Sequence, residues 1–307
     1  MSKISVIGTG FVGSSIAYSL MLTEIAEEVA LIDINETAVK AEAADIRPGF
    51  SFISPVRVFA GSWADTGNSD LIIITAGFNR KADESRLDLI GKNSKIAKSV
   101  AANLKENNAK APVIVVSNPV DVMTRIIAHE LNETDGRVFG TGCMLDAARF
   151  TYVLADFLHV PEKSVWAMVA GEHGAGQVLL WSSVEVKGQP LKDYLIENGL
   201  TMTDEDKKNI AKRVAGMGAE IIKGKGRTHY GIAGCTAFLA SAVLNNQAAI
   251  VPLTRPLNGE FGFYGSCVSL PCVLTGKGVC RSMTDSISPE EREEIRQAIV
   301  KLDEIGN

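Results

Sequence analysis

The stretch KISVIGTGFVG, from Lys3 to Gly13, decides how the first half of the chain folds. A short β-branched run leads into three glycines spaced GxGxxG, and a helical pattern follows at once. Gly8 permits a tight turn, Gly10 lets the backbone approach a pyrophosphate, and Gly13 allows helix and strand to pack closely. The phosphates would lie at the positive end of the helix. The stretch therefore predicts a strand, a phosphate-binding turn and a helix.

The same rhythm of strand and helix continues to about residue 142. Short apolar runs predict buried parallel strands, and longer amphipathic stretches predict the helices that connect them. We expect strands at 3–8, 28–33, 56–61, 71–77, 113–118 and 137–142. We expect helices at about 11–22, 36–46, 85–107 and 120–131. Strands joined by right-handed helical crossovers predict a doubly wound parallel sheet, which is a Rossmann fold.

The second half of the chain has a different pattern, in which helices and strands no longer alternate. We expect, in order, a helix near 145–158, strands in SVWAMVAG and VLLWSSVEV, helices near 204–223 and 230–245, a strand segment in LPCVLTGKGVCR and a closing helix. Ser288 and Pro289 are typical of the start of that closing helix. The order predicts an α+β domain. We place a dinucleotide-binding Rossmann domain at 1–142 and a substrate and catalytic domain at 143–307.

An acidic residue ends the second predicted strand. Asp33 lies 20 residues after Gly13, where a carboxylate can accept hydrogen bonds from both hydroxyls of an adenosine ribose. It would repel a 2′-phosphate, so NAD is favoured over NADP. A glycine turn used only for packing, with Asp33 capping a helix, is the simpler alternative, but the two features together favour a bound NAD.

Composition excludes several classes of protein. The 307 residues are 46% hydrophobic and 22% charged, which allows a well-packed core. The net charge is −5 and no basic block occurs, so we expect neither nucleic acid nor membrane as a partner. The opening residues lack a signal-peptide pattern and charges interrupt every apolar stretch, which predicts a cytoplasmic protein. The five cysteines form no CxxC pair, and we predict no bound metal.

Three further stretches carry side chains suited to chemistry. Asn118, in VVSNPVD, lies at the carboxyl end of the fifth predicted strand, where ligands of open α/β sheets bind. Asp146 and Arg149, in GTGCMLDAARF, share one helix face. His173, in AGEHGAG, follows an apolar strand. A single histidine is more often structural, but these residues together indicate a catalytic site.

With these motifs in this order, the chain from Gly8 to at least Arg281 resembles the L-lactate and L-malate dehydrogenase family of NAD-dependent 2-hydroxyacid dehydrogenases. The resemblance rests on GTGFVG, TAG, ESRLDL, SNPVD, LDAARF, GEHG and GKGRTHYGIA. It implies an oxidoreductase that interconverts a small L-2-hydroxy acid and its 2-oxo acid. It also implies a homodimer or homotetramer.

The resemblance assigns a role to each polar residue. His173 exchanges a proton with the substrate oxygen, and Asp146 orients the ring and raises the histidine pKa. Arg86 polarises the carbonyl as negative charge develops on it. The implied substrate-binding residues are Arg80, Arg86, Asn118, Arg149 and Thr228, with Arg149 holding the carboxylate through a bidentate fork. The implied cofactor-binding residues are Gly8, Gly10, Phe11, Val12, Gly13, Asp33, Thr75, Ala76, Gly77, Asn93, Ser117 and Asn118.

The choice of substrate depends on GFNRKADESR, residues 77–86, which by the resemblance is a loop that closes over bound substrate. Arg80 lies six residues before Arg86, where lactate-type enzymes usually carry Gln and malate-type enzymes carry Arg. A second substrate carboxylate enclosed by the loop needs a cationic partner. Arg80 therefore predicts malate and oxaloacetate as the preferred pair.

Other features leave alternatives open. GEHG and Thr228 fit the lactate-type pattern better, WSSVEVKGQP resembles enzymes of larger aliphatic 2-oxo acids, and Ala175 and Gly176 depart from the acid and Ser or Thr usual after the histidine. L-lactate or a larger L-2-hydroxy acid is thus the alternative substrate. An NAD-dependent glycosidase with a metal near Cys143 and a noncatalytic NAD-binding protein are further classes, and the complete His173, Asp146 and Arg149 set argues against both.

Overall fold

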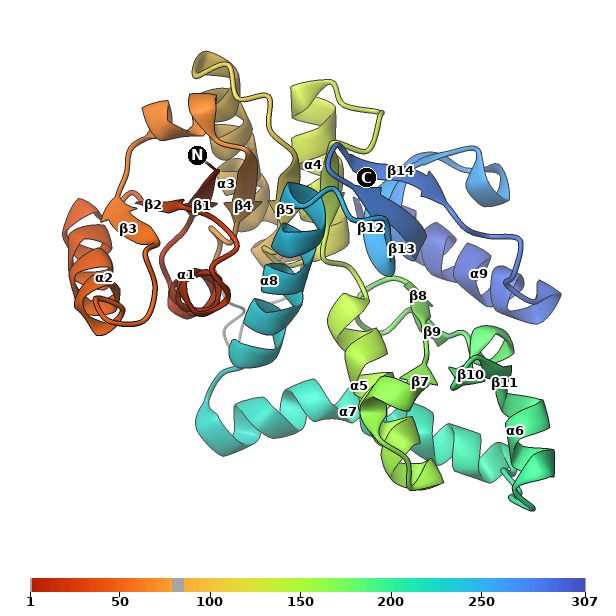
Figure 1. Cartoon of the computed structure of the whole chain (residues 1–307). Coiled ribbons are helices and arrows are strands. Elements are labelled where there is room, and N and C mark those ends of the chain that lie inside the picture. The colour runs from red at the N-terminus through yellow and green to blue at the C-terminus, as the bar shows by residue number, and fades with distance from the viewer. Residues whose placement is uncertain (1, 79–85, 307) are drawn as a thin grey trace.

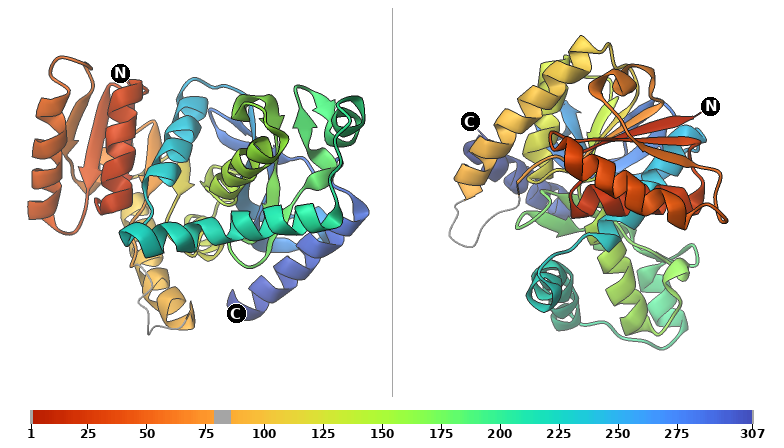
Figure 2. Two further views of the ribbon diagram at one scale, coloured as in Figure 1. Left: turned by 90° about the horizontal axis from the view of Figure 1, so that it is seen from below. Right: turned by 90° about the vertical axis from the view of Figure 1, so that its left-hand side faces the viewer.

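The computed structural model of the chain describes residues 2–78 and 86–306. The first half forms the strands at the left of Figure 1, and the helices around α5 and α7 lie at its lower right. One helix, α8, stands between these regions, and Figure 2 shows it alongside α1. Within the described chain, no helix is both long enough and apolar enough to cross a membrane.

The predicted doubly wound sheet is confirmed. In the described chain its parallel part runs in the order β3-β2-β1-β4-β5-β6, which is the Rossmann order. The strands are β1 (Lys3–Ile7), β2 (Glu28–Ile32), β3 (Arg57–Ala60), β4 (Leu71–Ile74), β5 (Val113–Val115) and β6 (Val138–Gly140). Helices α1 (Phe11–Thr23), α2 (Glu36–Gly49), α3 (Arg86–Glu106) and α4 (Val120–Leu131) connect them, together with the 3-10 turn η1 (Trp63–Asn68).

All six strands end before their apolar runs do, and two of them end three residues early. The runs at 71–77 and 113–118 form strands only to Ile74 and Val115. The next residues still bond to the neighbouring strands, since the Thr75 N–H donates to the Ile7 carbonyl and the Val116 N–H donates to the Ile74 carbonyl, both at 2.8 Å. The segments after them begin at the carboxyl edge of the sheet, where ligands of open α/β sheets bind.

The second half contains the predicted helices and several short strands. Its elements are α5 (Met144–Leu158), η2 (Glu162–Ser164), β7 (Val165–Trp166), β8 (Val169–Gly171), β9 (Gln177–Leu179), η3 (Trp181–Ser183), β10 (Glu185–Val186), β11 (Gln189–Pro190), α6 (Leu191–Glu197), α7 (Asp204–Lys225), α8 (Tyr230–Leu244), β12 (Ala249–Asn258), η4 (Glu260–Gly262), β13 (Tyr264–Thr275), β14 (Gly278–Ser282) and α9 (Pro289–Gly306). Ser288 caps α9, since its Oγ accepts from the Glu291 N–H at 3.3 Å.

The sheet does not end where the parallel strands end. β12 pairs antiparallel with β6, at Thr254 and Gly140, and β13 continues from β12 to β8. β12 is missing from the sequence prediction because Pro252 and Pro256 disfavour a strand. In the structure Pro252 lies opposite Pro271, so two residues without an N–H face each other. The two halves therefore share one sheet, and the boundary at 142/143 stays a prediction.

Two apolar cores support this arrangement. The larger one surrounds the parallel strands and includes residues of α8, β12, β13 and α9. The smaller one lies under α5 and α7 and includes Phe150, Val186 and Val214, all fully buried. The larger core thus contains side chains from both ends of the sequence, and the second half helps to bury the first.

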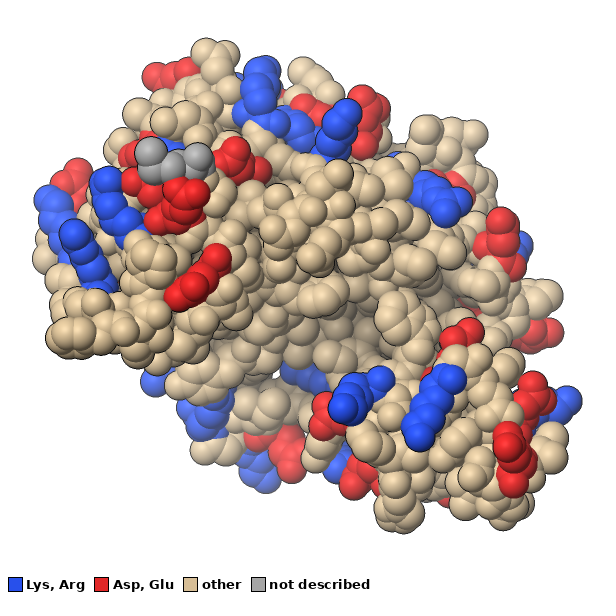
Figure 3. Space-filling model, in the orientation of Figure 1, with Lys and Arg blue, Asp and Glu red and all other residues tan. Residues whose placement is uncertain are grey.

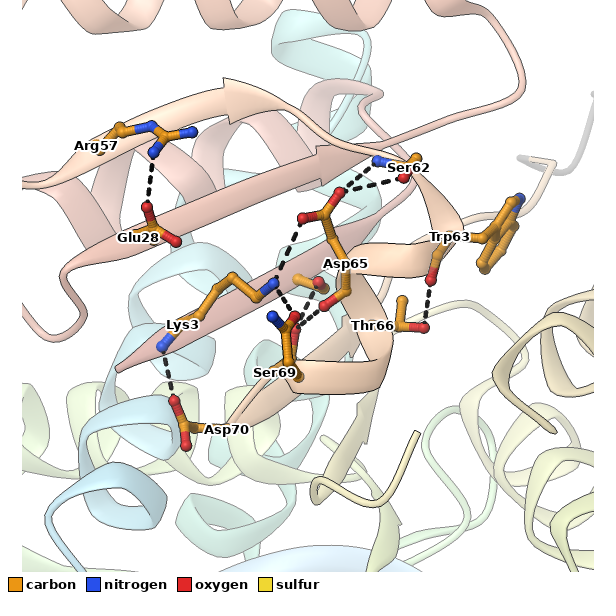
Figure 4. Close-up of polar contacts among 11 residues, drawn as sticks. Lys3, Glu28, Arg57, Ser62, Trp63, Asp65, Thr66, Ser69 and Asp70 are labelled. Atoms are coloured by element: carbon orange, nitrogen blue, oxygen red, sulfur yellow. Dashed lines mark hydrogen bonds and ion pairs between the residues drawn. The ribbon is translucent and has the colours of Figure 1, made fainter. Parts of the chain in front are cut away.

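A polar cluster fixes the amino end of the sheet (Figure 4). Lys3 is a buried cation on β1, and its Nζ lies 3.4 Å from Asp65 Oδ1 and also donates to Asn68 Oδ1 on η1. Its backbone N–H donates to Asp70 Oδ2 at 2.8 Å. Next to it, the hydroxyls of Ser5 and Ser69 are hydrogen-bonded at 2.8 Å. The cluster joins β1 to η1 and to the start of β4.

Candidate active site

The glycine-rich turn after β1 has the shape that a pyrophosphate needs. Gly8 has φ +96°, and a Cβ there would lie 2.5 Å from the Ala76 nitrogen. A Cβ on Gly13 would lie 1.9 Å from the Gly8 carbonyl oxygen. At Gly10, by contrast, a Cβ would meet nothing within 4 Å. Two of the glycines therefore serve packing, and the third leaves space at the start of α1, where a helix N-terminus favours a phosphate. The turn fits a dinucleotide.

Asp33 is held beside this turn. It is half-buried just after β2, and its Oδ2 accepts from the Thr9 backbone N–H at 2.8 Å. Its Oδ1 accepts from the Asn35 N–H at 3.1 Å. Both bonds fix the direction of the carboxylate on the flank of the glycine turn. This is the position that an adenosine ribose requires.

Two other predicted cofactor residues use their side chains to join neighbouring loops. The Thr75 hydroxyl donates to the Gly8 carbonyl at 2.8 Å. The Ser117 hydroxyl donates to the Ala76 carbonyl at 2.7 Å. The chain after β4 is thereby tied to the turn after β1 on one side and to the chain after β5 on the other.

Asn93 is a third brace of this kind. Its side chain is 1% exposed and lies on α3. Its Oδ1 accepts from the Phe78 N–H at 2.8 Å, and its Nδ2 donates to the Phe78 carbonyl at 3.1 Å and to the Asn118 carbonyl at 2.7 Å. The amide thus uses one acceptor and two donors on backbone groups, and it holds the start of the 77–86 segment against the chain after β5.

Of the other predicted cofactor residues, Phe11 is exposed on the first turn of α1 and Val12 packs against the larger core. Gly77 lies next to Asn93, since a Cβ on it would be 3.4 Å from Asn93 Nδ2. Asn118 is exposed at the carboxyl edge of the sheet, and its Oδ1 accepts from the Val120 N–H at 3.3 Å. All four therefore lie on segments that border the glycine turn or the edge of the sheet.

The three residues predicted for acid–base chemistry and anion binding lie together. His173 Nδ1 and Asp146 Oδ2 are 2.6 Å apart, and a carboxylate acceptor requires the proton on Nδ1. Arg149 Nη1 donates to Asp146 Oδ1 at 3.2 Å. The Asp146 side chain is 5% exposed, while that of His173 is 27% exposed. A shielded carboxylate therefore holds both an imidazole that solvent can reach and a guanidinium.

Local backbone structure explains how these side chains meet. Asp146 and Arg149 lie on the first turns of α5, which begins at the carboxyl end of β6. His173 lies in the hairpin between β8 and β9, and Gly171 before it has φ +88°. A Cβ on Gly171 would lie 2.4 Å from the Gly176 carbonyl oxygen. The tight hairpin thus depends on a glycine, and it turns the histidine towards α5.

The pKa shifts of this pair follow from its contacts. Burial would lower the pKa of His173, but the hydrogen bond and charge of Asp146, with the charge of Asp121, outweigh burial and raise it. Burial would raise the pKa of Asp146, but His173 and then Arg149 outweigh it and lower the pKa. The pair therefore favours an imidazolium next to a carboxylate, which suits a general acid.

A residue of SNPVD to which the sequence assigned no role also contacts the histidine segment. Asp121, on the first turn of α4, is 3% exposed. Its Oδ2 accepts from the His173 backbone N–H at 2.9 Å, and its Oδ1 accepts from the Thr254 hydroxyl at 2.5 Å. The sequence motif contained Asp121, but its partners are far away in the chain, so only the fold reveals the contact.

Some predicted residues are not tied to this group by the described contacts. Arg80 lies outside the described residues, and Arg86 begins α3 with a side chain that is likewise outside the description. Thr228 is half-buried and lies two residues before α8. The predicted roles of these three residues therefore remain predictions.

Cys143, considered as a metal ligand, is fully buried before α5. Burial, together with the charges of Asp146 and Asp121, raises its thiol pKa well above the ordinary value, and the thiol lies 3.8 Å from the Gly171 carbonyl. The thiol therefore stays protonated at neutral pH, whereas a metal needs a thiolate. Across residues 2–78 and 86–306, no group of three or more His, Cys, Asp or Glu side chains is arranged to hold a metal.

Comparisons with known proteins agree over the whole chain. Residues 2–140 match the family model of the lactate/malate dehydrogenase NAD binding domain, and residues 143–306 match that of the lactate/malate dehydrogenase alpha/beta C-terminal domain. L-lactate dehydrogenase 2 of Lactococcus lactis subsp. lactis (strain IL1403) is 36% identical over 304 residues, which cover 99% of this chain and 96% of the relative.

Further relatives give the same result. L-lactate dehydrogenase of Thermoanaerobacter sp. (strain X514) is 36% identical over 310 residues, which cover 99% of this chain and all of the relative. The crystal structure of minor L-lactate dehydrogenase from Enterococcus mundtii, in its ligands-bound form, matches with a TM-score of 0.95 at 34% identity and covers 99% of this chain and 97% of that one.

Fold, site and comparisons together define an NAD-dependent oxidoreductase of the 2-hydroxyacid dehydrogenase class. The chain belongs to the lactate/malate dehydrogenase family.

Proposed function

We propose that the protein interconverts L-lactate and pyruvate with NAD as the hydride carrier. The observation that carries the proposal is the group of His173, Asp146 and Arg149, which sets a proton donor and an anion-binding guanidinium on one buried carboxylate. The relatives named above are L-lactate dehydrogenases, and they support lactate as the substrate.

This proposal departs from the malate preference predicted from Arg80. The comparisons do not support malate as the first choice, because full-length relatives at 36% identity are L-lactate dehydrogenases. Arg80 is outside the described residues, so no contact of its side chain favours either acid. GEHG and Thr228, which fit the lactate-type pattern, agree with the relatives. Malate remains the second candidate because a cation lies six residues before Arg86.

The cofactor is held by the turn after β1 and by the carboxylate after β2. The free space at Gly10 and the start of α1 receive the pyrophosphate, and Asp33 accepts hydrogen bonds from the adenosine ribose. Asn93, Thr75 and Ser117 act indirectly, because their side chains join the loops that border the cofactor. Bound NADH supplies the hydride that reduces the carbonyl carbon.

The substrate is oriented and protonated by the chain itself. Arg149 binds the substrate carboxylate, since its planar guanidinium has donors beyond the one given to Asp146. His173 donates the Nε2 proton to the keto oxygen, and Asp146 stabilises the imidazolium beforehand and the correct tautomer afterwards. Asn118 hydrogen-bonds the substrate oxygen, Arg86 polarises the carbonyl, and Thr228 contacts the substrate.

The test is NADH oxidation with pyruvate, oxaloacetate and 2-oxoisocaproate, in the native protein and in Arg80→Gln. We expect pyruvate to have the highest kcat/KM in the native protein. Arg80→Gln should raise the kcat/KM for pyruvate relative to that for oxaloacetate, because it removes the cation that can pair with a second carboxylate. A higher native kcat/KM for oxaloacetate would return the assignment to malate, and a higher value for 2-oxoisocaproate would assign a larger substrate.

A further inference from the structure

We propose that Asp121 is a positioning residue for His173, which holds the histidine backbone in place and keeps a second negative charge close to its ring. The inference rests on the proposed function, because it assigns His173 the proton transfer. The hydrogen bond between the two residues joins Asp121 to the backbone N–H of His173, and in this proposal Asp121 does not touch the substrate. It acts through the histidine.

The contacts show how Asp121 can act. Each of its oxygens has a different partner: Oδ2 accepts from the His173 backbone N–H at 2.9 Å, and Oδ1 accepts from the Thr254 hydroxyl at 2.5 Å. The carboxylate thus joins α4, the β8–β9 hairpin and β12. Because β12 lies beside β6, this contact ties the hairpin to the centre of the continuous sheet.

The burial of Asp121 suggests that its negative charge has a role of its own, beyond the hydrogen bonds it accepts. A carboxylate at 3% exposure is costly even with hydrogen bonds. The backbone N–H of His173 would be satisfied equally by a neutral amide oxygen. What an amide cannot supply is negative charge, and that charge favours the protonated ring nearby.

The charged and titratable groups around His173 show why a second anion helps. Asp146 and Arg149 face it from α5, Asp121 from α4, Glu172 precedes it on the hairpin, and the neutral thiol of Cys143 lies before α5. Arg149 is needed for the substrate, but its positive charge lowers the pKa of His173. The charge of Asp121 raises that pKa and so offsets the effect of Arg149.

The decisive variant is Asp121→Asn. Asparagine is nearly the same size, its oxygen can accept from the His173 N–H, and its amide can donate to the Thr254 oxygen. The change therefore removes the charge and keeps both of these hydrogen bonds. Imidazole NMR titration reads the pKa directly, since the chain has four histidines and His173→Asn assigns the signal. We expect the pKa of His173 to fall in this variant, because one of the two carboxylates that raise it is lost.

Activity should report the same shift. Reduction of a 2-oxo acid needs protonated His173, so kcat/KM falls as the pH rises through its pKa. In Asp121→Asn this alkaline limb should move to lower pH by the amount that NMR measures, with the Kd for NADH unchanged. The matched control is Asp303→Asn on α9, which removes a carboxylate that contacts Arg125 and Ser266. Its His173 titration should coincide with that of the native protein.

Thr254→Val tests the hydrogen bond between Thr254 and Asp121 separately. It also replaces Asp121→Asn as the test if that variant does not fold. It removes the hydroxyl donor but leaves the charge, and we expect kcat/KM for pyruvate to fall roughly three- to ten-fold with unchanged NADH binding. The inference is overturned if His173 titrates in Asp121→Asn as in the native protein, if Asp303→Asn produces the same shift, or if Thr254→Val keeps native kcat/KM. Because NMR needs no turnover, a protein that reduces no 2-oxo acid would refute the function alone.

Discussion

Arg149 lies between Asp146 on its own helix and α7, and its side chain is 12% exposed. Its Nη1 donates to Asp146, and a Cβ on Gly218 of α7 would lie 3.6 Å from its Nη2. A glycine at this point of α7 leaves room beside the guanidinium. A bidentate contact with a carboxylate needs that planar fork, which lysine lacks.

Arg149→Lys should therefore reduce kcat/KM for pyruvate by roughly 10- to 100-fold, as expected for the loss of a charged hydrogen bond, while NADH binding stays near the native value. Steady-state kinetics and NADH fluorescence titration measure the two effects. Arg213→Lys is the control, since Arg213 pairs with Asp156 at 2.9 Å on the exposed side of the same two helices. Native kcat/KM in Arg149→Lys would contradict the assigned role.

At the same scale, the sequence predicts the residues of the site better than the contacts between them. Asp146 and Arg149 share one helix turn, and His173 stands in a glycine-rich motif, so local patterns select all three. The bond between Asp121 and Thr254 spans 133 positions. No local pattern encodes such a pairing, because it depends on β12 lying next to β6. Asn93 shows a similar limit, because the resemblance implies a cofactor contact for it, whereas its bonds to Phe78 and Asn118 are visible only in the fold.

At the scale of the elements, the contact between β1 and η1 depends on the buried cation of Lys3. Lys3→Met should lower the free energy of unfolding by about 1–3 kcal/mol, since it leaves Asp65 and Asn68 without their shared donor. Thermal unfolding at pH 7 measures this loss. Lys40→Met is the control, because Lys40 pairs with Glu36 at 3.6 Å on the exposed face of α2, and such pairs contribute little.

The stabilisation by the ion pair of Lys3 and Asp65 should depend on pH. Burial would raise the pKa of Asp65, but the Ser62 N–H and the charge and hydrogen bond of Lys3 outweigh it and lower the pKa below 3.8. The stabilisation is therefore present above pH 3.8 and is lost as the pH falls through the folded-state pKa. The difference in Tm between the native protein and Lys3→Met should narrow below that pH. A constant difference would show that the charge of Asp65 is not involved.

Helices and strands with a regular hydrophobic pattern were predicted from the sequence, whereas β12 was not. The six parallel strands and the helices that connect them follow from β-branched runs and amphipathic stretches. β12 was not predicted, because its sequence contains two prolines. In the structure the strand tolerates Pro252 opposite Pro271. The position of β12 in the sheet is set by its neighbours, which the local sequence does not contain.

At the scale of the whole molecule, the two helices α1 and α8, which pack against each other, carry large exposed apolar side chains. Tyr18 and Leu22 on α1 are 49% and 52% exposed, and Tyr230 and Phe238 on α8 are 70% and 50% exposed. The two helices are joined where Ser15 and His229 hydrogen-bond at 2.8 Å. Figure 3 shows a broad uncharged area in the middle of this view, with charged side chains around it. Such a surface is typical of a protein interface.

We therefore predict a homo-oligomer in which the exposed apolar side chains of α1 and α8 contact a second copy of the chain. Light scattering coupled to size exclusion should give a mass at least twice the 32.8 kDa of one chain. Tyr18→Ser combined with Phe238→Ser should lower that mass, since both side chains would be buried by a second copy. Ile196→Ser on α6, at a residue that is 69% exposed, should leave the mass unchanged. A native mass of one chain would contradict the prediction.

The continuous sheet has a consequence for the exchange of parts between relatives. A fragment ending at residue 142 would leave the backbone groups of β6 on an open edge, because β12 covers that edge and comes more than a hundred residues later. It would also lose α8, which packs on α1. The cofactor-binding half is therefore not a transplantable module, and a chimera that keeps it intact has to inherit α8 and β12 from the same parent.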